Sequence, residues 1–346
     1  MELTYLYLFG GIVYLLMGGD LLVRGAVALS RRWRLSPMVV GVTVVALGTS
    51  APELFVSIEA ALTGHPGIAL GNIVGSNIAN SLLVTGTLAL LLPIVAGPER
   101  SRFDAVVMMA VSVGLVILAW DHRIGAGEGT VLLIGLVAFL YRQVRVGRRI
   151  GGRPPRREGE LDWVLGLPSR TWMIVLLIAV GAIWLPIGAR LLVESAAEIA
   201  SHYGVSEAVI GLSLVALGTS LPELATVVIA AARRQLDVAL GNVIGSNILN
   251  ILAIMGTAAV VAPVALDVPP QFFPVDFPIM VGSALAIGGF VLFGRRLGRR
   301  AGAALIAAYV VYVGFLFTMI REPEADTSEV DAVLLDLPVE RPLSDL

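Results

Sequence analysis

Long apolar stretches, separated by short polar or charged loops, occupy most of the chain. A helix that spans a membrane needs about 20 mostly apolar residues. Ten stretches approach or exceed this length, and the fifth is the shortest of them. We expect spanning helices near 3–23, 37–62, 68–93, 104–120, 129–142, 171–199, 206–231, 238–263, 275–294 and 301–320. The pattern therefore predicts an all-α membrane protein with ten transmembrane helices.

Arginine residues are concentrated in alternate loops, and their placement predicts the orientation. Basic loops of membrane proteins face the cytoplasm. Arginine clusters follow the first, third, fifth, seventh and ninth spans, whereas the other loops between spans contain only Arg123. Ten spans with this bias place both termini on the extracytoplasmic side.

The two halves of the chain repeat each other at an offset of 170 residues. Residues 39–62 align with 209–232, and residues 68–87 align with 238–257, without a gap. Each half holds five spans, so the second half enters the membrane from the opposite side. This predicts two inverted-topology repeats with helices interrupted at the midplane, an architecture that places a substrate site between the halves.

The expected organisation follows from this repeat. Residues 1–142 form the first five-helix repeat, and 171–321 form the second. Between them, 143–170 is a basic cytoplasmic linker rich in Gly and Pro. The acidic tail, 322–346, is expected to be disordered because it lacks the apolar residues needed for a core.

Composition narrows the functional classes. Hydrophobic residues make up 57% of the chain and charged residues 14%, against roughly 25% charged in soluble domains. The chain has no cysteine, so disulfides, thiolate metal sites and cysteine nucleophiles are excluded. A net charge of −2 gives no basic field for nucleic acid. Nothing indicates an enzyme, a bound cofactor or an obligatory protein partner.

Two carboxylates lie in the middle of predicted spans. Glu53 occurs in GTSAPEL and Glu223 in GTSLPEL, at equivalent positions of the two halves. A charged acid at the centre of a membrane helix costs roughly 2.5–3.5 kcal/mol. No arginine lies in the middle of a span to neutralise them. The remaining compensator is a bound cation or a proton.

Oxygen-bearing residues accompany both acids. Proline frees the carbonyl four residues before it, which is that of Gly48 for Pro52 and that of Gly218 for Pro222. Hydroxyls and carbonyls are ligands that suit Na⁺ and Ca²⁺. The hydroxyl candidates next to the acids are Thr49, Ser50, Thr219 and Ser220.

A second motif, GNIVGSNIAN and GNVIGSNILN, recurs at 71–80 and 241–250. Residues four apart share one helical face, and the Gly residues allow close approach of another helix. The expected lining residues are Ser76, Asn80, Ser246 and Asn250. The expected packing or supporting residues are Asn72, Asn77, Asn242 and Asn247. The plainer alternative is that all of them only hydrogen-bond helices together.

The charge of this cluster predicts how it works. Two negative charges balance one Ca²⁺ or two Na⁺, so the site cannot hold Ca²⁺ and Na⁺ fully at the same time. Mutual exclusion at one site that opens alternately to either side is the physical basis of antiport.

Other charged residues near the spans have structural interpretations. Asp20 and Arg24 align with Arg190 and Glu194, with both charges reversed, and each pair lies four residues apart on one helix. We expect each pair to neutralise itself.

Three further acids lie near span ends. Glu59 is six positions after Glu53, off its helical face, and Ile229 replaces it in the second half. Asp104 and Asp276 begin spans, where capping residues are favoured.

The motif pairs ALGTSAPEL with GNIVGSNIAN, and ALGTSLPEL with GNVIGSNILN, resemble the cation/calcium exchanger superfamily, specifically prokaryotic sodium/calcium exchangers. The resemblance covers residues 3–320. It implies Ca²⁺ extrusion across the inner membrane, driven by entry of more than two Na⁺. It implies that the first and sixth spans slide across the core, and that Ala46 and Ala216 add carbonyls to a site whose central ligands are Glu53 and Glu223.

One position departs from some relatives, which carry Asp where this chain has Asn250. Asn at both Asn80 and Asn250 lowers the charge of the site and resembles the potassium-independent exchangers. A large cytoplasmic regulatory domain is absent, so regulation by a Ca²⁺ sensor is not expected.

Two other functions stay open at this point. The carboxylates could carry protons in a Ca²⁺/H⁺ antiporter, although the abundant hydroxyls favour Na⁺. A cation channel could use the same ligands, although channels are usually symmetric oligomers and this chain builds its own pseudo-twofold.

Overall fold

A computed structural model describes residues 2–95, 99–150, 168, 170–203 and 218–320. The chain divides into two units, 1–309 and 310–346, and helix α17 crosses the boundary between them. The expected acidic tail, 322–346, lies outside the described residues. So do most of the expected linker and the first part of the seventh span.

The first half contains helices and two short strands. Their bounds are α1 Glu2–Arg32, α2 Pro37–Val40, η1 Gly41–Val45, α3 Ala46–Thr49, α4 Ala51–Leu62, α5 Pro66–Ala79, η2 Asn80–Val84, α6 Thr85–Leu91, β1 Ile94–Val95, α7 Glu99–Leu118, β2 Arg123–Ile124 and α8 Ala126–Ile150.

The second half follows the same order where it is described. Its elements are α10 Thr171–His202, α13 Leu221–Ala232, α14 Leu236–Leu249, η4 Asn250–Met255, α15 Gly256–Val261, β3 Leu266–Asp267, η5 Pro270–Phe272, α16 Asp276–Leu292, β4 Arg296–Leu297 and α17 Arg299–Ile320. η5 is a 3₁₀ helix, whereas η1, η2 and η4 are π-helical turns inside longer helices.

The helices are long and apolar enough for a multi-pass membrane protein. Within the described residues, seven helices qualify as membrane spans, or eight if the bent pair Pro37–Thr49 and Ala51–Leu62 counts as one span. Of the other expected spans, 104–120 corresponds to α7. The span expected at 206–231 is described only in its last part, which is α13. The prediction of a helical membrane protein is confirmed, while the full ten-span inverted repeat stays a prediction.

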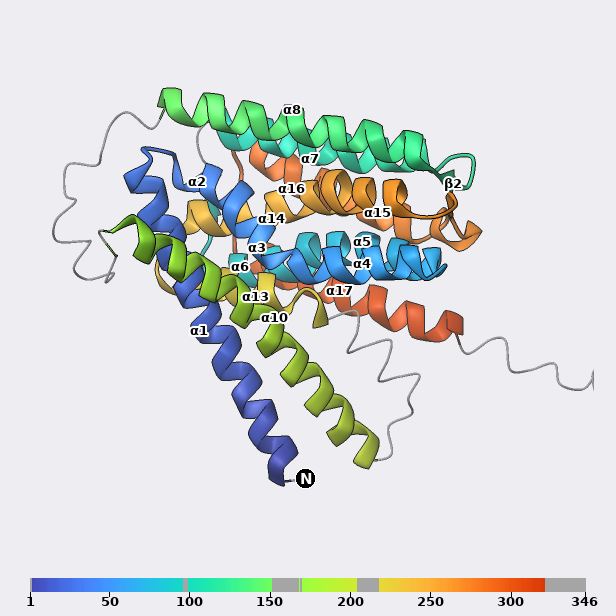
Figure 1. The fold of residues 1–346 in the computed structure, drawn as a ribbon, viewed down its shortest axis with the longest axis horizontal. Coiled ribbons are helices and arrows are strands. Elements are labelled where there is room, and N and C mark those ends of the chain that lie inside the picture. Colours follow the sequence, from blue (N-terminus) through green and yellow to red (C-terminus); the bar gives the residue numbers. More distant parts are fainter. Residues whose placement is uncertain (1, 96–98, 151–167, 169, 204–217, 321–346) are drawn as a thin grey trace, which may run out of the picture. The chain divides into compact units, whose positions relative to one another are not determined.

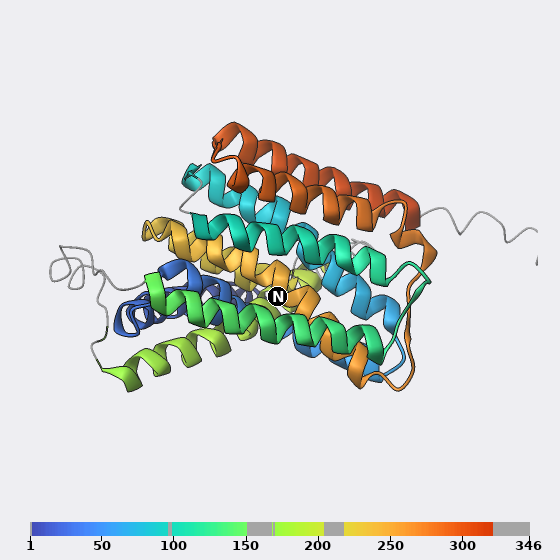
Figure 2. The same ribbon diagram turned by 90° about the horizontal axis from the view of Figure 1, so that it is seen from above.

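Two helices are almost wholly enclosed by the others. The membrane-spanning segments Pro66–Leu91 and Leu236–Val261 are 78% and 89% buried. Helices α7 and α8 run alongside α14 and α15 (Figure 2). By contrast, α1 and α10 lie side by side and run obliquely to the other helices (Figure 1). The enclosed helices are those that carry the two Asn-Ser motifs.

Two small antiparallel sheets join loops of opposite halves. β1 pairs with β4, and β2 pairs with β3. β1 and β3 follow corresponding helices, α6 and α15, while β2 and β4 precede α8 and α17. Each sheet therefore pairs a strand that follows α6 or α15 with a strand that precedes α17 or α8. This places the loop after the third expected span beside the loop after the ninth, as their shared arginine content requires.

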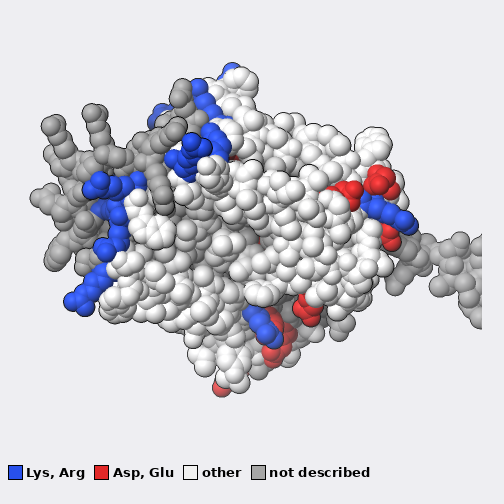
Figure 3. Space-filling model, turned by 45° about the horizontal axis from the view of Figure 1, so that its top comes forward, with Lys and Arg blue, Asp and Glu red and all other residues white. Residues whose placement is uncertain are grey.

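Charge is distributed as expected for a protein that crosses a membrane. On the face drawn in Figure 3, most described Arg side chains gather toward one end, and a mixed group with acidic residues lies toward the other. Most of the surface between them carries no charge. Large apolar side chains such as Phe55, Ile117 and Trp120 are 72%, 66% and 74% exposed, which suits contact with lipid.

Two expectations, one about a helix end and one about a charged residue, need correction. The fifth helix is not short, because α8 continues to Ile150 and takes up the start of the expected linker at 143–170. Its last residues are polar, so hydropathy alone ends the span too early. Asp104 is not a helix cap; it lies inside α7, is fully buried, and accepts a hydrogen bond of 2.5 Å from Gln143 Nε2. Asp276 does begin α16.

Candidate functional site

A break in the helix precedes the buried Glu53, and a residue of similar backbone conformation precedes the buried Glu223. Ser50 (φ −85°, ψ 10°) separates α3 from α4, and the pair is bent by 50°. Ser220 (φ −87°, ψ 0°) has nearly the same backbone conformation before α13. Proline in the first turn of each following helix lacks the N–H that would continue the preceding one. The predicted interruption of the helix is confirmed at Ser50, whereas most of the segment before Ser220 lies outside the described residues.

Glu223 receives hydroxyl groups from both halves of the chain. Its carboxylate is fully buried. Oε1 accepts a hydrogen bond of 2.9 Å from Ser50 Oγ and a longer one of 3.5 Å from Ser246 Oγ. Ser50 belongs to the break before Glu53, so this break lies close to Glu223 of the other half. This is the arrangement required of a site between two repeats.

Several oxygens in this cluster have no partner among the described residues. Both carboxylate oxygens of Glu53, and Oε2 of Glu223, are buried without a hydrogen bond. The Ser220 hydroxyl is also unpartnered. Buried polar groups in native proteins are almost always satisfied, and a buried charge without compensation is costly. A cation placed among these oxygens would compensate the buried carboxylates.

Asn80 and Asn250 occupy equivalent π-helical turns. Asn80 begins η2, and Asn250 begins η4. Both side chains are fully buried, and neither amide has a hydrogen-bond partner among the described residues. Single π-helical turns occur frequently at functional sites. Their amide oxygens are available as further neutral ligands.

Other expected ligands contact one another across the halves. Ser76 Oγ and Thr219 Oγ1 share a contact of 3.5 Å. Thr49 Oγ1 donates to Asn242 Oδ1 at 3.1 Å. The Ala46 carbonyl accepts the Ser50 N–H at 2.9 Å, so it is engaged in its own helix. Ala216 lies outside the described residues.

The asparagines expected to play a supporting role mostly do so by hydrogen bonding. Asn72 Nδ2 donates to the Glu53 carbonyl at 3.1 Å and to Ser57 Oγ at 2.8 Å. Asn247 Nδ2 donates to Ser81 Oγ at 3.1 Å. Asn77 differs, because both of its amide atoms are buried without a hydrogen-bond partner in the described chain.

The cluster is poor in the ligands of transition metals. Within the described ranges, no three His, Cys, Asp or Glu side chains gather closely enough to hold a metal. Two carboxylates surrounded by hydroxyl and amide oxygens form a hard-oxygen environment. Such an environment suits Na⁺ or Ca²⁺ rather than zinc.

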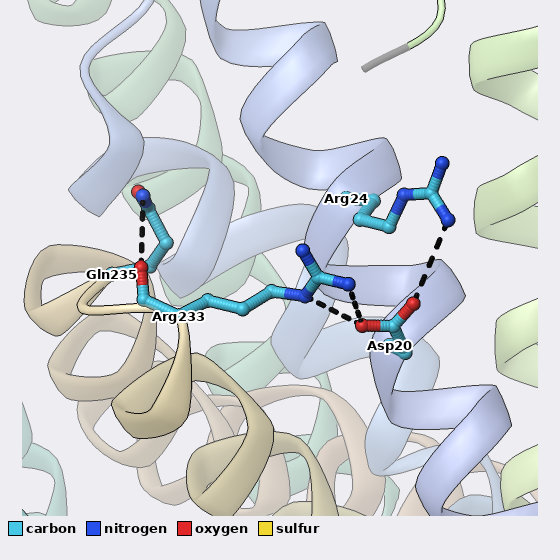
Figure 4. Close-up of polar contacts among 4 residues, drawn as sticks. All are labelled: Asp20, Arg24, Arg233 and Gln235. Carbon is cyan, nitrogen blue, oxygen red and sulfur yellow. Dashed lines mark hydrogen bonds and ion pairs between the residues drawn. The ribbon is translucent and has the colours of Figure 1, made fainter. Parts of the chain in front are cut away.

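Charged contacts outside the site were found only in part from the sequence. Arg190 pairs with Glu194 at 2.6 Å, and Arg24 lies 3.7 Å from Asp20, as expected. The contact that was missed joins Asp20 to Arg233 at the end of α13 (Figure 4). An acid inside the first span signals a need for a partner, but spacing along one helix cannot identify a residue 213 positions away.

Comparison with known proteins agrees with this geometry. The family model described as sodium/calcium exchanger protein matches residues 3–145 and 173–318. The putative antiporter CaxA of Alkalimonas amylolytica is 38% identical over 325 residues, which cover 92% of this chain and all of the relative. The sodium/calcium exchanger MaX1 of Methanosarcina acetivorans is 32% identical, with 91% of this chain and 98% of the relative covered.

A solved structure gives the same assignment. The sodium-calcium exchanger NCX_Mj, soaked with Na⁺ and Sr²⁺, superposes with a TM-score of 0.77 at 29% identity. The match covers 90% of this chain and 98% of NCX_Mj. The chain belongs to the sodium/calcium exchanger protein family and is a multi-pass membrane protein.

Proposed function

We propose that this protein exchanges Na⁺ for Ca²⁺ across a prokaryotic inner membrane, with Glu53 and Glu223 as the central ligands of one shared site. Family membership supports the reaction. The observation that carries the site is the set of buried carboxylate oxygens that have no partner among the described residues, close to the helix break at Ser50. Hydroxyl, carbonyl and amide oxygens complete the proposed ligands: Thr49, Ser50, Thr219, Ser220, Ser76, Ser246, Asn80, Asn250, Ala46 and Ala216.

Charge balance explains why binding of the two ions is exclusive. Two buried carboxylates are neutralised by one Ca²⁺ or by two Na⁺, and a site left empty of cations retains buried charge that opposes rearrangement. The loaded protein is therefore the form that changes access. In this proposal ten spans form two inverted repeats, and both termini are extracytoplasmic.

Sodium-gradient-driven ⁴⁵Ca²⁺ uptake into proteoliposomes tests this function. We expect uptake that requires a Na⁺ gradient and persists when a pH gradient is dissipated. Uptake driven by a pH gradient alone would identify a Ca²⁺/H⁺ antiporter instead. Ca²⁺ flux that is indifferent to every counter-ion gradient would identify a channel.

Asn250→Asp is expected to change the cation preference of the exchanger. It adds a third carboxylate to a fully buried cluster, so each bound cation gains an extra attraction that grows with its charge. We expect the ratio of half-saturating Na⁺ to half-saturating Ca²⁺ to change by at least about tenfold, which corresponds to about 1.4 kcal/mol. Concentration series for Na⁺, K⁺ and Ca²⁺ measure the effect, and unchanged dependence on all three would contradict a lining role for Asn250.

A further inference from the structure

Helices α1 and α10 pack closely against each other along their length. Along their contact, a Cβ added to Gly11 would lie 2.7 Å from the Leu192 nitrogen, and one added to Gly188 would lie 2.7 Å from the Leu15 nitrogen. A Cβ on Gly181 would lie 2.7 Å from the Gly18 carbonyl oxygen. Small residues that allow this approach are typical of strongly associated membrane helices.

This helix pair is much less embedded than the two enclosed helices that carry the Asn-Ser motifs. The spanning segments of α1 and α10 are 33% and 28% buried, against 78% for Pro66–Leu91 and 89% for Leu236–Val261. Alternating access in repeat-built transporters is largely rigid-body motion of one bundle against another. Displacing the α1–α10 pair disrupts less packing than displacing the enclosed helices.

A charged cluster joins this pair to the helix that carries Glu223. The Asp20 carboxylate accepts a hydrogen bond of 2.5 Å from Arg233 Nε and also contacts the Arg233 Nη2, while Arg24 Nη1 lies 3.7 Å away (Figure 4). The side chains of Asp20, Arg24 and Arg233 are only 27%, 28% and 25% exposed. Partly buried pairs are screened by salt much less than exposed ones, so this contact can hold the helices together.

The cluster lies toward the end of the protein where most Arg side chains gather (Figure 3), which we call the basic end. It lies away from the buried Glu53 and Glu223. Arg233 follows α13 directly, whereas Glu223 is in the first turn of that helix. Ten residues of helix separate them by about 15 Å. Between the two, α13 contacts α1, because a Cβ added to Gly19 would lie 3.4 Å from Ala225 and from Ile229.

The repeat symmetry offers no equivalent contact for the opposite state. At the offset of 170 residues, Asp20 corresponds to Arg190, and Arg233 corresponds to Thr63. Thr63 is uncharged and donates to the Glu59 carbonyl at 2.8 Å. Arg190 pairs within its own helix with Glu194, and these side chains are 79% and 59% exposed. If the two halves exchanged their conformations, the ion pair between Asp20 and Arg233 would therefore be lost, and no equivalent pair would replace it.

We propose that Asp20 and Arg233 form a one-sided tether, which holds the α1–α10 pair against α13 and keeps the basic end of the protein closed. The tether must break before the site opens to that side. It therefore makes the two access states unequal in free energy, and it favours the state that is closed at the basic end. The inference rests on the proposed antiport function, because only alternating access gives the tether two states to choose between.

The absence of cysteine from the chain allows a direct test with a single reporter. Ile229→Cys places a thiol on α13 between the tether and the site, at the contact with α1. Its reaction rate with a membrane-impermeant maleimide, added from the basic side, reports opening at that end. Asp20→Asn is expected to raise this rate at least about threefold by shifting the population toward the open state. Arg233→Gln is expected to do the same, and the double variant no more than either alone.

Glu194→Gln is the matched control, because it removes the symmetry-related pair with Arg190, which is exposed and lies within α10. We expect it to leave the labelling rate unchanged. Unchanged labelling in both Asp20→Asn and Arg233→Gln would overturn the tether, and so would an equal rise in Glu194→Gln. Labelling requires no transport, so a wild-type protein without sodium-driven Ca²⁺ flux would refute the exchange function on separate grounds.

Discussion

Replacing either Glu53 or Glu223 with Gln is expected to abolish sodium-driven Ca²⁺ transport while leaving the protein in the membrane. Both side chains are fully buried, and three of their four carboxylate oxygens have no partner among the described residues. Gln has nearly the same shape, so the change removes charge rather than packing. A single remaining carboxylate cannot neutralise Ca²⁺. Removing one member of a buried, compensated charge pair costs about 3–5 kcal/mol, which is roughly a hundredfold or more in affinity.

Glu59→Gln provides the matched control on the same helix. Glu59 lies on α4 six residues after Glu53, but its side chain is exposed and Ile229 takes its place in the second half. We expect near wild-type ⁴⁵Ca²⁺ uptake for this variant in proteoliposomes. Wild-type uptake by Glu53→Gln or by Glu223→Gln, at equal protein content, would show that the cluster is not the transport site.

The positions of the helices could be predicted from the sequence because the membrane imposes a simple rule. Apolar length identifies the segment that crosses lipid, and α16 and α17 begin and end within two residues of expectation. The same rule fails where a helix extends into water. Both α1 and α8 continue through arginine-bearing turns, to Arg32 and Ile150, because backbone hydrogen bonding rather than hydropathy determines where they end.

The residues that gather around Glu53 and Glu223 could be proposed from the sequence, but their contacts could not. The repeated motifs identified both buried acids, and proline predicted the break at Ser50. The spacing argument for Asn80 assumed a regular helix, whereas a π-helical turn begins at that residue and changes the direction of the side chains that follow. Hydrogen bonding is also unequal between the halves. Ser50 donates to Glu223, but the equivalent Ser220 hydroxyl has no partner among the described residues.

Unequal contacts of this kind arise because a transporter can occupy only one access state at a time. The two inverted repeats that we propose have similar sequences and must then adopt different local arrangements in one molecule. Sequence symmetry predicts what the halves share, and the tertiary structure determines which half holds which role. The contact between Asp20 and Arg233 belongs to this second class, since its two residues come from different halves and have no symmetric counterpart.

Gly245→Ala is expected to destabilise the protein, although it adds only one methyl group. Gly241 and Gly245 form the small-residue face of α14, which packs against α2 and η1 of the other half. A Cβ at position 245 would lie 2.5 Å from the Val42 carbonyl oxygen and 2.6 Å from the Val42 Cα. These are backbone atoms, so relief requires a shift of the whole segment rather than a change of rotamer.

The predicted destabilisation combines a packing cost with damage to the site. Overpacking a well-packed contact costs about 1–3 kcal/mol. Val42 leads into the break at Ser50, and Ser246 follows Gly245 directly, so a shift at this contact separates the hydroxyls that meet at Glu223. A lower midpoint of thermal unfolding in detergent, with reduced ⁴⁵Ca²⁺ uptake, is the expected result. Gly114→Ala on α7 is the control, since its added methyl group meets no described atom within 4 Å. Equal midpoints for the two variants would mean that this close contact between the halves contributes nothing to stability.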